Sequence, residues 1–272
     1  MSATPEREYV LGTDDEEITR LGVQHRVWRP RALEAWRRAG FRSGHTIADL
    51  GSGPGYAAQD LAELVGPAGR VVAIERSRRF LDALEREATR RGVANIVTYE
   101  RDLDTDPLPE VELDGAWCRF VAAFAKRPRA FVAAICKRLR SGGAIVFHEY
   151  LDYAAWRLLP PSPEFDEFVH AVIATWRASG GEPDIGLALP AWLETEGLRV
   201  EVRAIGDVVS PSDPIWQWPM SFFEVGLRRL VTIGAFTNER AETIAAAVGR
   251  HQASNNTRML PPIVGEIIAH RS

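Results

Sequence analysis

The sequence is poor in cysteine and has no long apolar run, and each absence excludes a class of protein. Cys118 and Cys136 are its only cysteines, so a disulfide framework is not expected. No stretch of about eighteen consecutive apolar residues occurs, so a membrane-spanning helix is not expected either. Residues 1–8 are polar and acidic and lack the basic start and apolar segment of a secretory leader. These features predict a soluble protein of the reducing cytoplasm.

An excess of positive charge is missing as well. The formal net charge is −4 and no long basic run occurs, so general attraction to nucleic-acid phosphates is weak. Hydrophobic residues make up 46% and charged residues 26% of the chain, which is typical of a globular fold with a sizeable core. We therefore expect a small-molecule partner rather than a nucleic acid or a membrane. Composition leaves the oligomeric state open.

What the sequence does have is a glycine-rich turn after a short apolar strand. Residues 47–50 are expected to form a buried strand and residues 56–65 the helix that follows, with three glycines at alternate positions between them. Glycines there allow positive φ and a close approach of backbone to ligand, beside the free N–H groups of a helix N-terminus. The spacing is G-x-G-x-G rather than the G-x-G-x-x-G of dinucleotide sites, because Tyr56 stands where the third glycine would fall. A nucleotide-like ligand other than NAD is therefore favoured.

Acidic residues end two of the expected strands. Asp49 stands two residues before the first glycine, where it would repel a pyrophosphate but suits the ammonium group of an amino-acid-bearing nucleoside. Glu75 follows the apolar run 71–74 and lies 24 residues after Gly51. At about this distance an acid at a strand end meets ribose hydroxyls in α/β nucleotide-binding folds. A surface glutamate at a strand end is the alternative.

The pattern D-x-G-x-G-x-G over residues 49–55 resembles the first motif of class I S-adenosylmethionine-dependent methyltransferases, of the small-molecule type found in quinone and natural-product biosynthesis. The resemblance covers about residues 46–149, and it implies S-adenosylmethionine as cofactor and S-adenosylhomocysteine as product. A helix ahead of the first strand could also cover the glycine turn. The expected cofactor contacts are Asp49, Gly51, Ser52, Gly53, Gly55, Glu75, Arg76, Asp102, Leu103, Cys118, Arg119 and Gln24.

The resemblance also implies roles within this set. It assigns Glu75 to the ribose hydroxyls and Asp102 to the adenine amino group, with the backbone N–H of Leu103 at the adenine ring. It places Cys118 and Arg119 beside the methionine portion of the cofactor, at the end of the fourth strand.

The sequence departs from the family pattern at Arg101, where a glycine is usual, so Asp104 and Asp106 stay open as alternatives to Asp102. Cys118 as a small buried hydrophobe and Gln24 as an exposed helical polar residue also stay open. The motif of an asparagine or aspartate, two prolines and an aromatic residue, seen in enzymes that methylate base amino groups, is absent. This absence argues against a nucleic-acid base as acceptor.

Alternating strand and helix patterns predict an α/β fold with a doubly wound, mostly parallel sheet. The resemblance implies seven strands, of which the last is antiparallel. We expect residues 1–45 to form an N-terminal helical segment covering the cofactor site, and residues 46–272 the class I domain, with helical cap segments at about 150–180 and 211–257. A capping pair, Thr13 and Glu16, is expected to open the first helix, and Pro30 to start a second one.

Candidate catalytic and acceptor-binding residues follow the strand at 144–147. His148 is the first candidate for a general base, because its ordinary pKa lies near neutrality, and Glu149 and Tyr150 are its neighbours. A structural histidine is the alternative. Aromatic residues also gather in the cap segments, where helical core packing is the alternative to recognition. Those near segment starts and prolines are the candidate acceptor contacts: Tyr153, Trp156, Trp216 and Trp218.

Together these features favour methyl transfer from S-adenosylmethionine to a small, largely apolar or aromatic acceptor, on oxygen, nitrogen or carbon. The sulfonium methyl is already activated, so alignment and water exclusion matter more than many catalytic residues. The alternative is a protein that binds S-adenosylmethionine for another reaction or as a sensor. Hydride transfer with NAD is disfavoured by the glycine spacing, and no metal site is expected because the cysteines lack ligand spacing.

Overall fold

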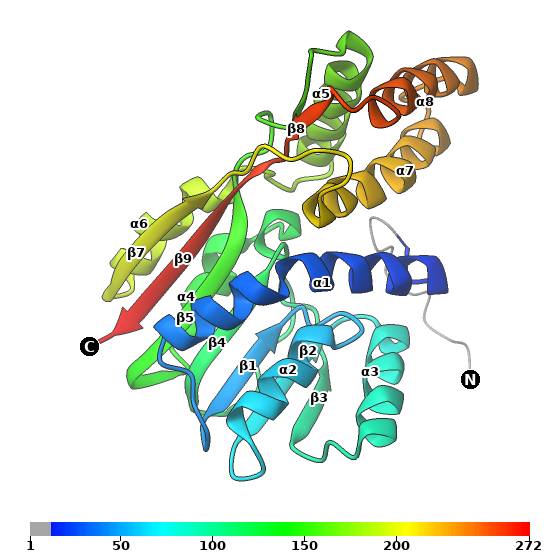
Figure 1. Ribbon diagram of the computed structural model, residues 1–272. Helices are drawn as coiled ribbons and strands as arrows, with labels where there is room; N and C mark the ends of the chain where they lie inside the picture. The colour runs from blue at the N-terminus through cyan, green and yellow to red at the C-terminus, as the bar shows by residue number, and fades with distance from the viewer. Residues whose placement is uncertain (1–11) are drawn as a thin grey trace.

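The computed structural model describes residues 12–272, and its centre is one seven-stranded sheet (Figure 1). The strand order is β3-β2-β1-β4-β5-β9-β7. The first five strands in this order are parallel, whereas β9 is antiparallel to β5 and β7. The expected seven-stranded, mostly parallel sheet with an antiparallel last strand is confirmed. Its strands are β1 (Thr46–Leu50), β2 (Arg70–Glu75), β3 (Ile96–Glu100), β4 (Leu113–Arg119), β5 (Leu139–Asp152), β7 (Leu198–Ile205) and β9 (Ile263–Arg271).

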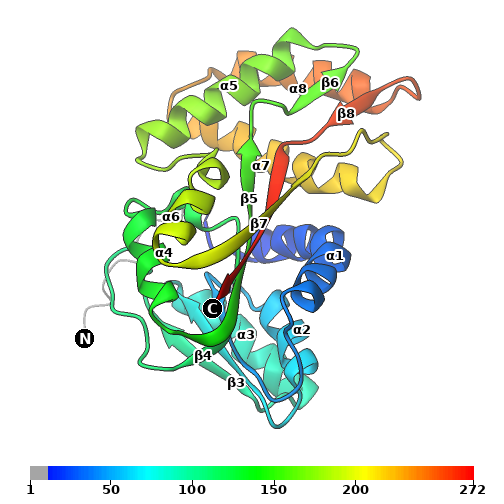
Figure 2. The same cartoon turned by 90° about the vertical axis from the view of Figure 1, so that its left-hand side faces the viewer.

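Helices cover both faces of the sheet, which explains why its central strands are apolar on both sides (Figure 2). On one face, α1, α2 and α3 pack around a core that includes Trp36, Ile47 and Trp117. On the other face, α4 and α6 pack around Leu50 and Ile145. These helices are α1 (Asp15–Arg38), α2 (Tyr56–Val65), α3 (Arg78–Arg91), α4 (Pro128–Cys136) and α6 (Leu189–Thr195).

Helix α1 differs from the expectation at its start and at Pro30. Its N-cap is Asp14, whose carboxylate accepts a hydrogen bond from the Glu17 N–H at 2.9 Å, one residue later than the capping pair at Thr13 predicts. Pro30 lies inside one continuous helix instead of starting a second. Because Pro30 and Arg26 are exposed, water can solvate the Arg26 carbonyl that lacks a helical N–H partner.

Beyond the carboxyl ends of the parallel strands lies a layer of helices and a two-stranded ribbon, which we call the cap (Figure 1). Its elements are β6 (Arg157–Leu159), α5 (Pro163–Ala178), α7 (Gln217–Thr232), α8 (Asn238–Gln252) and β8 (Arg258–Leu260). The helices fall within the expected cap segments. The second segment contains two helices separated at Gly234, where φ is +75°. The ribbon was not expected, because strands of three residues show no alternation that a sequence can reveal.

Three short 3-10 helices complete the described fold: η1 (Ala122–Phe124), η2 (Ile185–Leu187) and η3 (Pro214–Trp216). None of the helices in residues 12–272 combines the length and apolar content that a bilayer crossing requires. The division of the chain at residue 45 stays a prediction. Residues 1–11 of the expected N-terminal segment, which include the polar and acidic residues 1–8, lie outside the described residues.

Candidate functional site

A cavity runs along the carboxyl ends of the parallel strands, under α1, and continues beneath the cap. Figure 1 shows α1 lying between the sheet edge and α7. The cavity has two halves that differ in chemistry. The lining of the glycine half includes ten of the expected cofactor contacts: Gln24, Asp49, Gly51, Ser52, Gly53, Glu75, Arg76, Asp102, Leu103 and Arg119. The aromatic half is lined by Phe120, Phe124, Tyr150, Tyr153, Trp156, Trp176, Trp218 and Phe222.

The glycine turn contains two positions, Gly51 and Gly55, whose backbone angles and close neighbours only glycine fits. Gly51 and Gly55 have φ of +67° and +85°, values that L side chains rarely adopt. A Cβ at Gly51 would lie 2.5 Å from the Val121 side chain, and one at Gly55 would lie 2.3 Å from Leu84. Gly55 therefore packs against α3 at the start of α2 and does not line the cavity, unlike Gly51.

Glu75 ties the end of β2 to this turn. Its side chain is buried, with Oε2 accepting from the Gly53 N–H at 3.0 Å and Oε1 from the Ser77 N–H at 2.9 Å. Burial raises the pKa of Glu75, and these two backbone hydrogen bonds oppose that rise. The carboxylate is thus held at the cavity wall with lone pairs left for further donors. Contact with ribose hydroxyls stays a prediction.

Asp49 is the penultimate residue of β1 and Arg119 the last residue of the neighbouring β4, and both face the same half of the cavity. Within the described residues, Asp49 Oδ2 and Arg119 Nη1 are buried and have no hydrogen-bond partner. Burial raises the pKa of Asp49 to about 7, although the Arg119 charge opposes the rise. Burial also lowers the pKa of Arg119 to about 10. An orphaned carboxylate oxygen beside an orphaned guanidinium nitrogen suits a ligand that carries both an ammonium and a carboxylate.

The loop after β3 contains three aspartates with different surroundings. Asp104 accepts from the Lys126 and Arg127 N–H groups, both at 3.0 Å, so its carboxylate supports the start of α4. Asp106 accepts from the Asp102 N–H at 2.8 Å. Asp102 and Asp104 both line the cavity, and Asp102 accepts from the Asp104 N–H at 2.9 Å. Because both Asp104 oxygens already accept backbone N–H groups, Asp102 stays the predicted adenine contact.

The structure does not bring Cys118 to the cavity. Its side chain is fully buried in the core on the α4 face, and burial raises the pKa of the thiol well above its ordinary value. Trp117 and Arg119 do line the cavity. Because successive residues of a strand point to opposite faces, Cys118 cannot share their direction. The residue behaves as the small buried hydrophobe that was the alternative.

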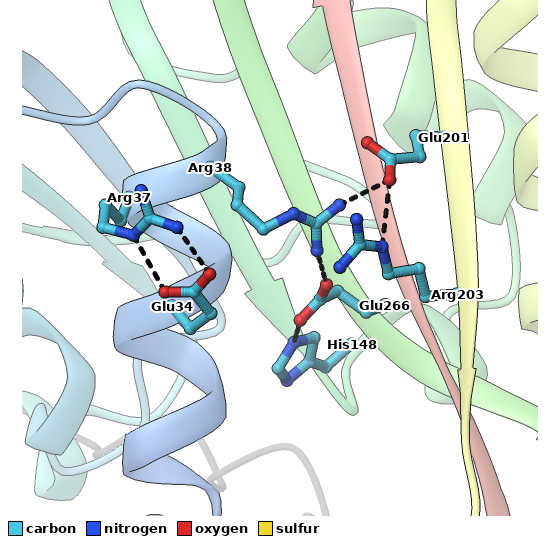
Figure 3. Close-up of polar contacts among 7 residues, drawn as sticks. All are labelled: Glu34, Arg37, Arg38, His148, Glu201, Arg203 and Glu266. Carbon is cyan, nitrogen blue, oxygen red and sulfur yellow. Dashed lines mark hydrogen bonds and ion pairs between the residues drawn. The ribbon is translucent and has the colours of Figure 1, made fainter.

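His148 is also away from the cavity lining. It is fully buried on β5, with ring centroids 5.4 Å from Trp28 and 4.8 Å from Trp117. Figure 3 shows its Nε2 directed at Glu266, 3.5 Å from Oε2, and Glu266 in turn paired with Arg38 of α1. Burial lowers the pKa of His148. This placement departs from the expected base at the cavity and matches the structural alternative.

Glu149 points to the opposite face of β5 and supports the chain after β4. Its Oε1 accepts from the N–H groups of Val121 and Ala122, both at 2.7 Å, at the start of η1. The side chain is fully buried, and burial raises the pKa of Glu149 to about 8. Just before these residues, Phe120 has φ of +55°, which is unusual for a bulky residue. Glu149 thus holds a strained turn that carries an aromatic ring into the cavity.

Near-parallel rings form one wall of the aromatic half. Phe120 lies 4.7 Å from Tyr150 at an interplanar angle of 13°, and 5.6 Å from Trp218 at 9°. Of the candidate acceptor contacts, Tyr153, Trp156 and Trp218 also line the cavity. Trp216 does not: it is 2% exposed and packs within the cap core.

Several lining residues were not among the sequence-based candidates. Trp176 and Phe222 fall in helical stripes whose spacing predicts core packing, and a residue that lines a cavity under a helix has the same spacing. Glu17 and Arg20 line the cavity from α1 as a buried bidentate pair, with Arg20 Nε and Nη2 donating at 2.7 and 2.6 Å. This pair could have been predicted from the sequence, because Glu17 and Arg20 are an acid and a base three residues apart on the helix expected to cover the glycine turn.

Residues 47–143 match the family described as "Methyltransferase domain". A curated relative, "Ubiquinone/menaquinone biosynthesis C-methyltransferase UbiE" of Saccharophagus degradans, is 25% identical over 151 residues, which are 51% of this chain and 59% of the relative. The chain thus spans less than two thirds of that relative's length.

Two solved structures share the fold. The first is a SAM-dependent methyltransferase from Geobacter sulfurreducens in complex with S-adenosyl-L-homocysteine (TM-score 0.52, 18% identity, 95% of this chain and 92% of that chain). The second is the [4+2]-cyclase SpnF (TM-score 0.52, 17% identity, 87% of this chain and 79% of that chain). Residues 47–143 thus match a methyltransferase domain, and the glycine turn and acidic strand ends lie at one cavity of a fold shared with class I methyltransferases, which use S-adenosylmethionine as cofactor.

Proposed function

We propose that the protein transfers a methyl group from S-adenosylmethionine to a small, largely aromatic or apolar acceptor. The observation that supports this most is the continuity of the cavity, in which the glycine half and the aromatic half adjoin at Arg119 and Phe120. A cofactor in the first half would face an acceptor in the second. This is the arrangement that methyl transfer needs and that a cofactor site alone does not.

In the glycine half, Asp49 would hold the ammonium and Arg119 the carboxylate of the methionine portion. Glu75 would accept from the ribose hydroxyls, and Asp102 from the adenine amino group, with Leu103 beside the ring. The cofactor supplies an activated sulfonium methyl when it is bound. The chain's own residues then have three tasks: to bind, to align the acceptor and to keep water out.

In the aromatic half, two hydroxyl groups are available to orient an acceptor. Within residues 12–272, neither the Tyr150 nor the Tyr153 hydroxyl makes a hydrogen bond with the protein, and their rings are 8% and 2% exposed. Burial raises the pKa of both phenols, so they stay protonated and act as donors. An acceptor that presents an oxygen atom from a flat ring would satisfy them and stack on Phe120 and Trp218.

The relative from Saccharophagus degradans is named as a C-methyltransferase of ubiquinone and menaquinone biosynthesis. We therefore place quinone-type and phenolic rings first among the acceptors to test, without distinction between carbon, oxygen and nitrogen as the methylated atom. The net charge of −4 supports a small molecule rather than a nucleic acid as partner. A cytoplasmic location stays a prediction.

The alternative, a cofactor-binding protein that does not transfer methyl, gains support from SpnF, which has this fold and is named as a [4+2]-cyclase. Calorimetry with S-adenosylmethionine, S-adenosylhomocysteine and NAD tests the cofactor assignment. Chromatographic quantification of S-adenosylhomocysteine, with and without phenolic and quinone-type acceptors, then tests the transfer. S-adenosylhomocysteine that forms only when an acceptor is present supports the proposal, whereas tight binding of unchanged S-adenosylmethionine with every acceptor favours the alternative.

A further inference from the structure

Behind Arg119, a chain of buried polar side chains leads away from the cavity to α2. Arg119 Nη2 lies 3.3 Å from His25 Nδ1, and His25 Nε2 lies 3.1 Å from Asp60 Oδ2. Asp60 also accepts from Arg29 Nε at 2.7 Å. His25 and Asp60 are 6% and 8% exposed. The ring of Tyr56 stacks on His25 at a centroid distance of 5.8 Å.

The chemistry of these partners determines which nitrogen of His25 carries the proton. A guanidinium has only donors, so the His25 Nδ1 that faces Arg119 must accept and is unprotonated. A carboxylate accepts, so Nε2 carries the hydrogen and donates it to Asp60. His25 is therefore neutral in this arrangement. Burial lowers its pKa, the hydrogen bond to Asp60 opposes this, and the Arg119 charge adds to the lowering.

The same contact determines the direction of Arg119. With Nη2 directed to His25, the second terminal nitrogen, Nη1, is the one left without a partner among the described residues, in the half of the cavity where Asp49 Oδ2 is also unpaired. We infer that His25 is a positioning residue, whose unprotonated Nδ1 holds Arg119 in the orientation that binds the carboxylate end of the cofactor. This inference rests on the proposed function, because it assumes that S-adenosylmethionine occupies the glycine half.

Protonation of His25 would remove the acceptor. Two N–H groups would then face each other between His25 and Arg119, and the guanidinium would lose its support. The groups that face His25 are Asp60 and Tyr56 of α2, Arg29 of α1 and Arg119 of β4. Of these, only Asp60 favours the protonated ring, and its carboxylate is shared with Arg29. Cofactor affinity should therefore decline as the pH falls below 6.5, the ordinary pKa of histidine.

Two amide substitutions separate the two hydrogen bonds of the ring. His25→Asn places an amide near the position of Nδ1 and keeps an acceptor for Arg119, whereas His25→Gln reaches the position of Nε2 and keeps a donor for Asp60. The ligands are S-adenosylhomocysteine and 5′-methylthioadenosine, which has the same nucleoside but no amino-acid end. Calorimetric affinities at pH 8 and melting temperatures of the two variants and the parent protein form the experiment.

We expect His25→Gln to weaken S-adenosylhomocysteine binding by about tenfold, the scale of one hydrogen bond to a charged group. Methylthioadenosine binding should stay unchanged. His25→Asn should bind S-adenosylhomocysteine about as tightly as the parent protein does at pH 8. Below pH 6.5 it should not show the loss of affinity that protonation of His25 causes in the parent protein. Asp49, whose pKa burial raises to about 7, is present in both proteins and contributes to both pH profiles, so the difference between the two profiles isolates His25.

Equal affinities of the two variants for S-adenosylhomocysteine would overturn the inference, as would a parallel loss for methylthioadenosine, because a purely structural histidine would affect both ligands alike. Failure of the parent protein to bind either ligand would instead contradict the proposed function itself. A parent affinity that rises below pH 6.5 would also overturn the inference, since it would mean that protonated His25 attracts the carboxylate.

Discussion

At the scale of single residues, the cavity is organised by polar groups at strand ends whose hydrogen bonds hold the glycine turn open. Glu75 is the clearest case, because each of its oxygens accepts from a backbone N–H of the turn or of the loop after β2. The predicted ribose contact would use the remaining lone pairs. A single side chain thus has one structural and one binding role, and the two can be measured separately.

We predict that Glu75→Ala weakens S-adenosylhomocysteine binding by about 1.5–3 kcal/mol, the contribution of hydrogen bonds to a charged group. The matched control is Glu100→Ala. Glu100 pairs with Glu75 across β2 and β3 but is exposed and outside the cavity lining. Calorimetry on both variants checks the prediction. Undiminished affinity in Glu75→Ala would remove the ribose assignment.

Glu149 makes stability depend on pH. Its pKa is raised by burial from 4.5 to about 8, so the folded protein favours the protonated carboxyl. The stabilisation from this group is therefore complete below pH 4.5 and is lost as the pH rises through about 8. Glu149→Gln keeps an acceptor for the N–H groups of Val121 and Ala122 but does not ionise.

We predict that the free energy of unfolding of Glu149→Gln falls less than that of the parent protein between pH 5 and about pH 8.5. Urea denaturation across this range is the measurement. Glu149→Ala, which removes the acceptor as well, should be less stable than the parent by about 1–3 kcal/mol. Identical pH profiles for parent and Glu149→Gln would mean that Glu149 does not titrate as its burial indicates.

Residues at strand ends were predictable from sequence, whereas side-chain directions were not. Asp49 and Glu75 were found because an apolar run followed by an acid marks a strand end, and strand ends meet at one edge of a parallel sheet. Cys118 lies one residue before the end of β4, but His148 lies inside β5, which continues to Asp152 instead of ending at residue 147, and both side chains turn into the cores on either face of the sheet. The direction depends on the exact residue at which each strand begins, and an apolar run buried on both faces does not reveal it.

At the scale of elements, α1 lines the cavity with its first half and contacts strands β9 and β7, at one edge of the sheet, with its last turn. Arg38 near its end pairs with Glu266 of β9 and, at 2.7 Å, with Glu201 of β7 (Figure 3). The Arg38 and Glu266 side chains are 13% and 8% exposed. The neighbouring Arg37 pairs with Glu34 within the helix and is open to water. One helix thus carries a buried and an exposed ion pair side by side.

We predict that Arg38→Ala lowers the free energy of unfolding by about 3 kcal/mol, because the buried Glu266 loses its guanidinium partner and keeps only His148, whose pKa is lowered by burial. Arg37→Ala should leave stability nearly unchanged, since exposed pairs contribute little. Chemical denaturation of the two variants gives the comparison. Equal losses of stability in the two variants would show that the buried Arg38–Glu266 pair contributes no more to stability than the exposed Arg37–Glu34 pair.

The cap offers a matched pair of tryptophans. Trp216 is buried away from the cavity, whereas Trp218, two residues on, lines it. Trp216→Ala should lower stability by roughly 3–5 kcal/mol and leave acceptor KM unchanged. Trp218→Ala should raise acceptor KM or redirect acceptor choice, whatever its effect on stability. Denaturation and acceptor kinetics on both variants decide, and destabilisation of both without any change in acceptor preference would contradict the assignment of the aromatic half.

Helices and strands were predicted best where the segment was long enough to show a repeating pattern of apolar residues. The strands and helices of the sheet layers carry clear patterns, and so do α5 and α7. The three-residue strands β6 and β8 do not. The prediction that Pro30 starts a second helix was wrong, because an exposed helical backbone can tolerate one missing hydrogen bond. Trp176 and Phe222 were assigned to helical cores, because helical periodicity marks the inward face of a helix and does not distinguish a packed core from the wall of a cavity.

At the scale of the whole molecule, the cavity is assembled from segments that are far apart in the chain: α1, the ends of β1 to β5, and both cap segments. The sequence predicted each of these parts but not the way they close over one another. Continuity of the glycine and aromatic halves is therefore the property that only the folded structure supplies. It is also the property on which the proposed methyl transfer depends.

The most direct test of this account is to follow the methyl group itself. The protein is incubated with S-adenosylmethionine carrying a trideuterated methyl group and with phenolic and quinone-type acceptors, and the products are analysed by mass spectrometry. The account predicts an acceptor that is heavier by one trideuteromethyl group, formed in equal amount with S-adenosylhomocysteine, and reduced yield from the Glu75→Ala variant. Bound but intact labelled cofactor, with no labelled product from any acceptor, would contradict it.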